Sequence, residues 1–199
     1  MDIRIGELAN SNALWGSERG REVQGMIRNQ MDAQPSDRMI CISLKGVLMM
    51  DATFFREAVV LLVKQHLGEK GFCLKDVENA DVLSNARYAA GFGHKTKNQP
   101  ITVWLEDSVE FIGRFEPDQL IETAYDVIRV GEMTSSKLAA DRGISISLAS
   151  MKLKQLADRG YLLRETRSAE TGGIEVSFWR FVSRFLNVKK PIVDGLFHA

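Results

Sequence analysis

The sequence predicts a mixed α/β domain followed by a smaller unit of three helices and a β-hairpin. Up to about residue 115, short β-branched runs alternate with segments of helical periodicity, as in a sheet covered by helices. Pro117 stands just before an amphipathic run, where proline suits a helix start. The charge also changes along the chain: residues 1–115 hold 14 basic against 15 acidic residues, and residues 137–190 hold 11 against 5. We therefore expect two domains, at residues 1–116 and 117–199.

Composition excludes several classes of protein. The chain has 199 residues, and its 26 basic and 26 acidic residues cancel, which excludes a uniformly basic nucleic-acid coat but not a local basic patch. A hydrophobic share of 45% excludes disorder as the dominant state. No apolar run approaches the roughly 18 residues of a membrane span, and the first residues lack the apolar core of a secretory signal. We expect a cytoplasmic protein that does not enter a membrane.

Periodicity and capping residues predict the elements of the first domain. One helix is expected from Ser17, whose hydroxyl can cap it. Another is expected from about Asp51, where Asp51 or Thr53 can cap it, to Gly68, which can end it. The remaining elements continue the alternation: strands at 38–44, 71–77 and 100–106, a helix at 78–93, and a strand or connector at 108–115.

Several short motifs of this domain match a known family. They are Ser17, Arg21, the strand ISLKGV, Thr53-Phe54, Glu57 and the segment ENADVL. Together they resemble the STAS-like domains, which are relatives of the anti-sigma-factor antagonists. The resemblance implies a mixed sheet with covering helices, and a protein partner. In the better-understood antagonists a Ser or Thr at the start of this helix is a phosphorylation switch. Here Ala52 stands where one hydroxyl is expected, and Thr53 is the nearest match.

The resemblance therefore assigns a regulatory role to Asp51 and Thr53. A helix N-terminus also favours an anion, because its backbone N–H groups lack partners and the helix dipole is positive there. A phosphate at this end would add up to two negative charges and block an acidic partner. An ordinary helix cap is the alternative role for either residue.

The second domain has the pattern of a winged helix. Residues 118–130 put five apolar side chains on one helical face. Thr134 or Ser135 can cap a second helix, Gly143 supplies the tight turn, and Ser145 or Ser147 can cap a third helix, which Gly160 ends. Alternating residues at 161–164 and 174–178 then form a hairpin. The pattern LAxxxGIS…LxxLxxRGYLLRE, from residue 138 to residue 165, is similar to the winged helix-turn-helix domains of bacterial transcription regulators.

Such a domain would contact DNA through the third helix and the basic residues around it. Apolar side chains such as Ile146 and Met151 on this helix cannot make the paired hydrogen bonds that identify guanine or adenine, but they can contact thymine methyl groups. The basic residues would neutralise phosphates and give salt-dependent binding. The candidate DNA-binding residues are Lys137, Ser145, Ser147, Ser150, Met151, Lys152, Lys154, Arg164 and Arg167.

The sequence offers little support for catalysis. Its three histidines are scattered, and Cys41 and Cys73 form no CxxC pair, so we expect no metal site and two buried thiols. It contains no glycine-rich nucleotide loop and no nucleophile elbow. The loop at 91–99 carries His94, Lys95 and Lys97, which could bind an anion or simply be solvated. We expect no cofactor and no enzymatic activity.

The sequence is compatible with two functions. The first is a transcription regulator that binds double-stranded DNA as a homodimer at a palindromic site, with the STAS-like domain sensing a partner or signal. The second is a protein–protein adaptor or antagonist of a partner-switching system, without DNA binding. The basic second half favours the first, and the apolar residues on the third helix favour the second. The aromatic and basic tail at 178–199 would pack on the winged helix or form a dimer surface.

Overall fold

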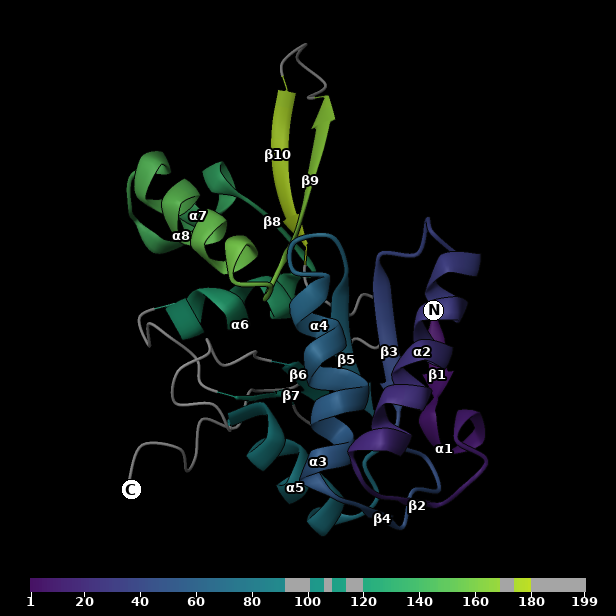
Figure 1. The fold of residues 1–199 in the computed structure, drawn as a ribbon. Coiled ribbons are helices and arrows are strands. Elements are labelled where there is room, and N and C mark those ends of the chain that lie inside the picture. The colour runs from purple at the N-terminus through teal and green to yellow at the C-terminus, as the bar shows by residue number, and fades with distance from the viewer. Residues whose placement is uncertain (92–100, 106–108, 114–119, 169–173, 180–199) are drawn as a thin grey trace.

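The computed structural model describes residues 1–91, 101–105, 109–113, 120–168 and 174–179 of the chain (Figure 1). The loop after residue 91, the proposed boundary at Pro117 and the tail after residue 179 lie outside the described residues. The protein is an α/β protein with a mixed sheet and helices.

The first part of the chain forms a five-stranded sheet in the order β1-β3-β5-β6-β7. The first four strands in this order run parallel, and β7 runs antiparallel to β6. A separate two-stranded parallel pair joins β2 to β4. The strands are β1 (Asp2–Arg4), β2 (Ala13–Leu14), β3 (Met39–Ser43), β4 (Met49–Met50), β5 (Gly71–Lys75), β6 (Ile101–Trp104) and β7 (Val109–Ile112).

Helices cover one face of this sheet (Figure 1). They are α1 (Ile5–Leu8), α2 (Ser17–Ala33), α3 (Ala52–Phe55), the π-helical turn η1 (Arg56–Val60), α4 (Leu61–Gln65) and α5 (Ala80–Gly91). Side chains alternate along a strand, so Ile40 and Ile42 of β3 enter the core beneath the helices. Cys41 and Ser43 therefore lie on the opposite face.

The remaining described residues form a second group of helices and strands. Their order is α6 (Ile121–Val130), β8 (Glu132–Thr134), α7 (Ser135–Arg142), α8 (Ile146–Asp158), β9 (Leu163–Ser168) and β10 (Ile174–Trp179). The three strands make an antiparallel sheet in the order β8-β10-β9. In Figure 1 the β9–β10 hairpin extends away from the rest of the molecule, with α7 and α8 to one side of it.

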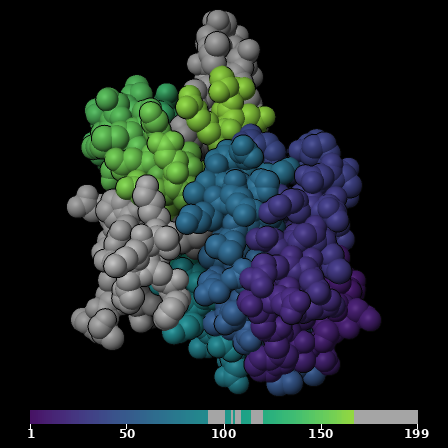
Figure 2. Space-filling model, in the orientation of Figure 1, coloured from purple at the N-terminus to yellow at the C-terminus, as the bar shows by residue number. Residues whose placement is uncertain are grey.

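Two hydrophobic cores meet at β7. Ile112 belongs to the core beneath the helices, whereas Val109 and Phe111, on the other face of the strand, pack with α6, α7, α8 and Tyr161. The Phe111 ring lies edge-on to Tyr161, with ring centroids 5.7 Å apart. Figure 2 shows the atoms of the second group packed directly against those of the first.

Most of the expected helices and strands occur, and some of them begin or end at other residues than expected. The residue that precedes α2 is Gly16, at φ +79°, so Ser17 is the first helical residue and not the cap. The segment expected to be a strand or connector is the strand β7. The short elements β1, α1, β2, β4 and β8 are additional to the expected ones, because elements of two to four residues are too short to show a periodicity.

Candidate functional site

The helix α8 is held at its start by the expected turn. Gly143 adopts the left-handed conformation, at φ +61°, and ends α7. Ser145 is extended, and its Oγ accepts a hydrogen bond from the Leu148 N–H at 3.2 Å, so Ser145 and not Ser147 caps α8. Ala149, Leu153 and Leu156 face the second core, as their spacing predicts.

The opposite face of α8 is open to solvent. It carries the predicted residues Ser147, Ser150, Met151 and Lys154. Two of its apolar side chains are well exposed, Ile146 at 60% and Met151 at 50%. Lys152 is half-buried at the side of the helix rather than on its outer face. The outer surface of α8 is therefore formed by serine and apolar side chains. Lys154 is the one predicted basic residue that lies on it.

The other predicted bases lie on neighbouring elements. Lys137 is exposed in the first turn of α7, and its backbone N–H donates to Thr134 Oγ1 at 3.2 Å, which makes Thr134 the cap of α7. Arg164 is exposed on β9, and its carbonyl oxygen accepts a hydrogen bond from Arg38 Nη1 at 3.1 Å. The Arg167 side chain lies outside the described part of the chain.

An ion-pair cluster that the sequence patterns do not predict fixes α7 against α6. The Arg142 Nε donates to Asp126 Oδ2 at 2.6 Å, and Nη1 donates to Glu122 Oε2 at 3.0 Å. The hydrogen bond to Asp126 is the main cause that raises the pKa of Arg142. Asp126 is buried among the apolar positions of α6 and also binds Arg129 at 3.1 Å. A single acid among the apolar positions of an amphipathic helix was the sequence signal for this cluster.

The two predicted regulatory residues at the start of α3 have different environments. Asp51 Oδ1 accepts from the Phe54 N–H at 2.5 Å, and Oδ2 accepts from the Gly16 N–H at 3.0 Å. Asp51 therefore caps α3 and also holds the start of α2. Thr53 lies inside the first turn of α3, is exposed and does not cap the helix.

Glu57 follows on the same helix and is buried. It accepts hydrogen bonds from Arg56, at 2.7 Å from Nη2 and 3.2 Å from Nε, and Arg21 Nη1 lies 3.7 Å from its other oxygen. Arg21 and Glu57 thus meet across the junction of α2 and η1. Ser17 lies one helical turn before Arg21 on α2.

Three exposed apolar residues lie on or next to the paired strands β2 and β4. Trp15 directly follows β2, Leu48 directly precedes β4, and Met49 is the first residue of β4. The register places β2 and β4 side by side. The three residues are 52%, 58% and 50% exposed, respectively. Asp51, which directly follows β4, donates its backbone N–H to the Leu14 carbonyl at 3.0 Å. The three apolar residues therefore lie close to the start of α3.

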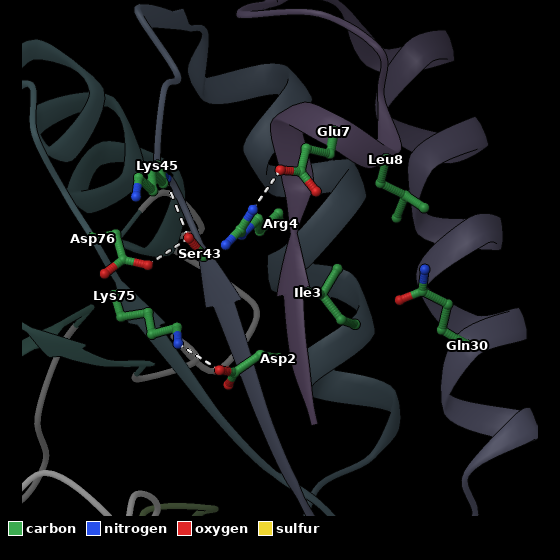
Figure 3. Close-up of a pocket in the computed structure, with 10 residues that line it drawn as sticks. All are labelled: Asp2, Ile3, Arg4, Glu7, Leu8, Gln30, Ser43, Lys45, Lys75 and Asp76. Atoms are coloured by element: carbon green, nitrogen blue, oxygen red, sulfur yellow. Dashed lines mark hydrogen bonds and ion pairs between the residues drawn. The ribbon is translucent and has the colours of Figure 1, made fainter.

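A polar cavity of about 680 Å³ opens around the edge strand β1 (Figure 3). The side chains that line it are largely paired with one another. Lys75 Nζ binds Asp2 at 2.6 Å, Arg4 binds Glu7 at 2.7 Å, and Ser43 Oγ donates to Asp76 Oδ2 at 2.5 Å. The lining also includes Lys45, so that it holds three cationic and three acidic side chains. The cavity therefore favours neither a positive nor a negative ligand.

Within the described residues, no three His, Cys, Asp or Glu side chains come together in a way that would hold a metal ion. No helix of the same residues combines the length and apolar character needed to cross a membrane. Comparison with protein-family models gives no match to this chain, and comparison with curated proteins finds no relative.

Proposed function

We propose that the protein is a DNA-binding transcription regulator, in which residues 121–179 act as a winged helix and the first domain senses a partner or signal. The observation that carries the proposal is the solvent-exposed face of α8 next to a projecting hairpin. The order α6-β8-α7-α8-β9-β10 is that expected of a winged helix, with α8 as the recognition helix and β9–β10 as the wing.

The side chains near α8 favour contacts to the DNA backbone over contacts to base edges. Lys137, Lys154 and Arg164 are exposed on α7, α8 and β9, the elements of the proposed helix-turn-helix and wing, and would bind phosphates. The serines of α8 can donate to phosphates or to bases, and Ile146 and Met151 would contact thymine methyl groups. We therefore expect strongly salt-dependent binding with modest sequence preference.

The test is a mobility-shift titration with DNA from the gene's own genomic neighbourhood. Lys152→Glu combined with Lys154→Glu should abolish binding at moderate salt and leave the fold intact. The matched control is Lys45→Glu combined with Lys64→Glu, which reverses two exposed lysines of the first domain. For the single variant Lys154→Ala, loss of one phosphate contact should reduce the salt slope by about 1. Equal affinity of the folded α8 double variant and the wild type would refute DNA binding through α8.

A protein–protein adaptor is the second candidate, and the exposed apolar residues on α8 favour it. Ile146 and Met151 form part of a surface that a protein partner could bury. The two candidates separate in one experiment. An adaptor would show no DNA affinity above that of the Lys152→Glu/Lys154→Glu variant at any salt concentration. In an adaptor, Ile146→Ser combined with Met151→Ser would abolish binding to a protein partner.

For the first domain we propose a partner-binding surface around Thr53. Thr53 is exposed in the first turn of α3, two residues after Asp51, and Trp15, Leu48 and Met49 are exposed on or next to the β2–β4 pair that leads into this helix. Exposed apolar residues of this kind commonly mark an interaction surface. Thr53→Glu should weaken partner binding in pull-down experiments, because it adds a negative charge as a phosphate would. Thr53→Ala should retain binding. Recovery of the same partners at the same yield by the glutamate variant would show that Thr53 has no regulatory role.

A further inference from the structure

The two cysteines of the chain are neighbours in the sheet. They are direct partners in the register of the parallel strands β3 and β5, and both side chains lie on the face opposite the helices. The Cys73 thiol donates a hydrogen bond to Cys41, with the two sulfur atoms 2.8 Å apart. Although 32 residues separate them along the chain, the fold therefore presents them as a dithiol.

The strand geometry suits a covalent bond between the two sulfur atoms. Neighbouring strands lie about 4.8 Å apart, which is within the roughly 4.4–6.8 Å between Cα atoms that disulfides span. Partner residues in a parallel pair also project their side chains from the same face of the sheet. Bond formation would therefore require rotation of the two side chains and little movement of the backbone.

The environments of the two thiols differ in a way that assigns them different roles. Cys41 is half-buried, and the hydrogen bond from Cys73 lowers its pKa, assisted by the Lys75 ammonium and opposed by burial and by Asp2. Cys73 is fully buried, and this burial raises the pKa of its thiol well above the usual value. The thiolate is the nucleophilic form of cysteine. Cys41 is thus the accessible and more nucleophilic sulfur, and Cys73 is held next to it as its hydrogen-bond donor.

We propose that Cys41 and Cys73 form an oxidation site, in which a peroxide converts the dithiol into an intrachain disulfide. Cys41 loses its proton to solvent, and its thiolate attacks one peroxide oxygen. The O–O bond breaks, the other oxygen leaves as hydroxide and takes up a proton from solvent to become water, and Cys41 becomes a sulfenic acid. The Cys73 sulfur then attacks the Cys41 sulfur, the S–O bond breaks, and the hydroxyl leaves as a second water with the Cys73 proton. Two electrons pass from the dithiol to the peroxide, and a thiol reductant reverses the reaction.

The position of the pair connects it to the second core. One row of register partners crosses the sheet from Asp2 through Cys41, Cys73 and Thr102 to Phe111. Phe111 packs edge-on against Tyr161, which follows α8. The disulfide between Cys41 and Cys73 would therefore form in the same row of residues as Phe111, which contacts the second group of elements. The oxidation site itself does not depend on the proposed DNA binding.

The test uses the full chain, reduced and then freed of reductant. Hydrogen peroxide should lower the number of thiols that an aromatic disulfide reagent titrates in denaturant from two to none. The product should remain a single chain on a non-reducing gel, have lost two hydrogen atoms by mass, and regain both thiols with dithiothreitol. In Cys73→Ser, a 1,3-dicarbonyl reagent should trap a sulfenic acid on Cys41. In Cys41→Ser, Cys73 should remain a thiol.

Three outcomes would overturn the proposal: both thiols surviving peroxide in the folded wild type, a disulfide between two chains, or oxidation of Cys41→Ser at the wild-type rate. Wild-type protein treated in guanidinium is the control for proximity in the fold, and its disulfide should form more slowly than in the folded protein. Because Cys73 is buried, circular dichroism must show that its serine variant folds. If that variant does not fold, thiol counts on the wild type and on Cys41→Ser still show whether the two cysteines form the oxidation site.

Discussion

At the scale of single residues, Asp51 illustrates how one side chain can serve two elements. Its two carboxylate oxygens accept separate backbone N–H groups, one in the first turn of α3 and one at Gly16 before α2. Local sequence identifies either Asp51 or Thr53 as a possible cap, because both residue types occur commonly at this position. The second bond, across 35 residues, favours aspartate because it has two acceptor oxygens.

The residue-scale prediction compares the two candidate caps. Asp51→Ala should lower the free energy of unfolding by about 1–2 kcal/mol, because it removes the cap of α3 and leaves the Gly16 N–H without its acceptor. Thr53→Ala should change it by less than about 0.5 kcal/mol, as for exposed residues without a special role. Urea unfolding followed by circular dichroism measures both. A larger loss in Thr53→Ala than in Asp51→Ala would contradict this assignment of the cap.

At the scale of elements, the crossing of α2 over α3 and η1 requires a glycine. A Cβ atom added to Gly20 would lie 2.8 Å from both the Phe54 carbonyl oxygen and Glu57 Cβ. The carbonyl is backbone within a helix and cannot move aside as a flexible side chain would. Gly20 thus permits the close approach that brings Arg21 next to Glu57.

The element-scale prediction uses a second glycine of α2 as its control. Gly20→Ala should destabilise the protein by about 1–3 kcal/mol through overpacking. Gly25→Ala has nothing within 4 Å of the new Cβ and should stabilise it by about 0.5–1 kcal/mol, because alanine has the higher helix propensity. Thermal or urea unfolding of the two variants measures the difference. Equal effects of the two substitutions would show that α2 crosses α3 and η1 without a close contact at Gly20.

At the scale of the whole molecule, the two groups of elements share β7. The proposed boundary near residue 116 lies after this strand, yet Val109 and Phe111 contribute side chains to the second core. Arg38, before β3, also binds the Arg164 carbonyl at the base of the hairpin. Separating the chain at residue 116 would therefore remove apolar contacts from the second group. The division into domains at 1–116 and 117–199 remains a prediction.

Two fragments test that division. We expect fragment 117–199 to retain helical circular dichroism, because most of the second core lies within it. Fragment 105–199 should melt at a higher temperature, since it restores Phe111, and loss of a buried phenylalanine costs about 3–5 kcal/mol. Phe111→Ala in the longer fragment should remove most of that gain. If 117–199 is unfolded while the full chain is stable, the two groups share one core and the division is wrong.

The sequence by itself determined the parts of this protein that depend on neighbours a few residues apart. The helix α8, its cap within the Ser145 or Ser147 alternative and its core positions at 149, 153 and 156 follow from helical spacing and local hydrogen bonding. The same holds for β3 and β5, whose apolar β-branched runs are bounded by turn residues. Where two neighbouring residues could each cap a helix, the local sequence did not distinguish them, as with Thr134 and Ser135 at the start of α7.

Only the tertiary structure decided which distant residues meet. The register of β3 and β5 places Cys41 beside Cys73, whereas a one-residue shift would put the two thiols on opposite faces of the sheet. The link from Asp51 to Gly16, the cluster of Asp126 with Arg142, and the place of Phe111 in the second core likewise join residues that no local period connects. Strand pairing and core packing are set by the burial of whole faces against one another. The periodicity of one segment does not identify the segment that packs against it.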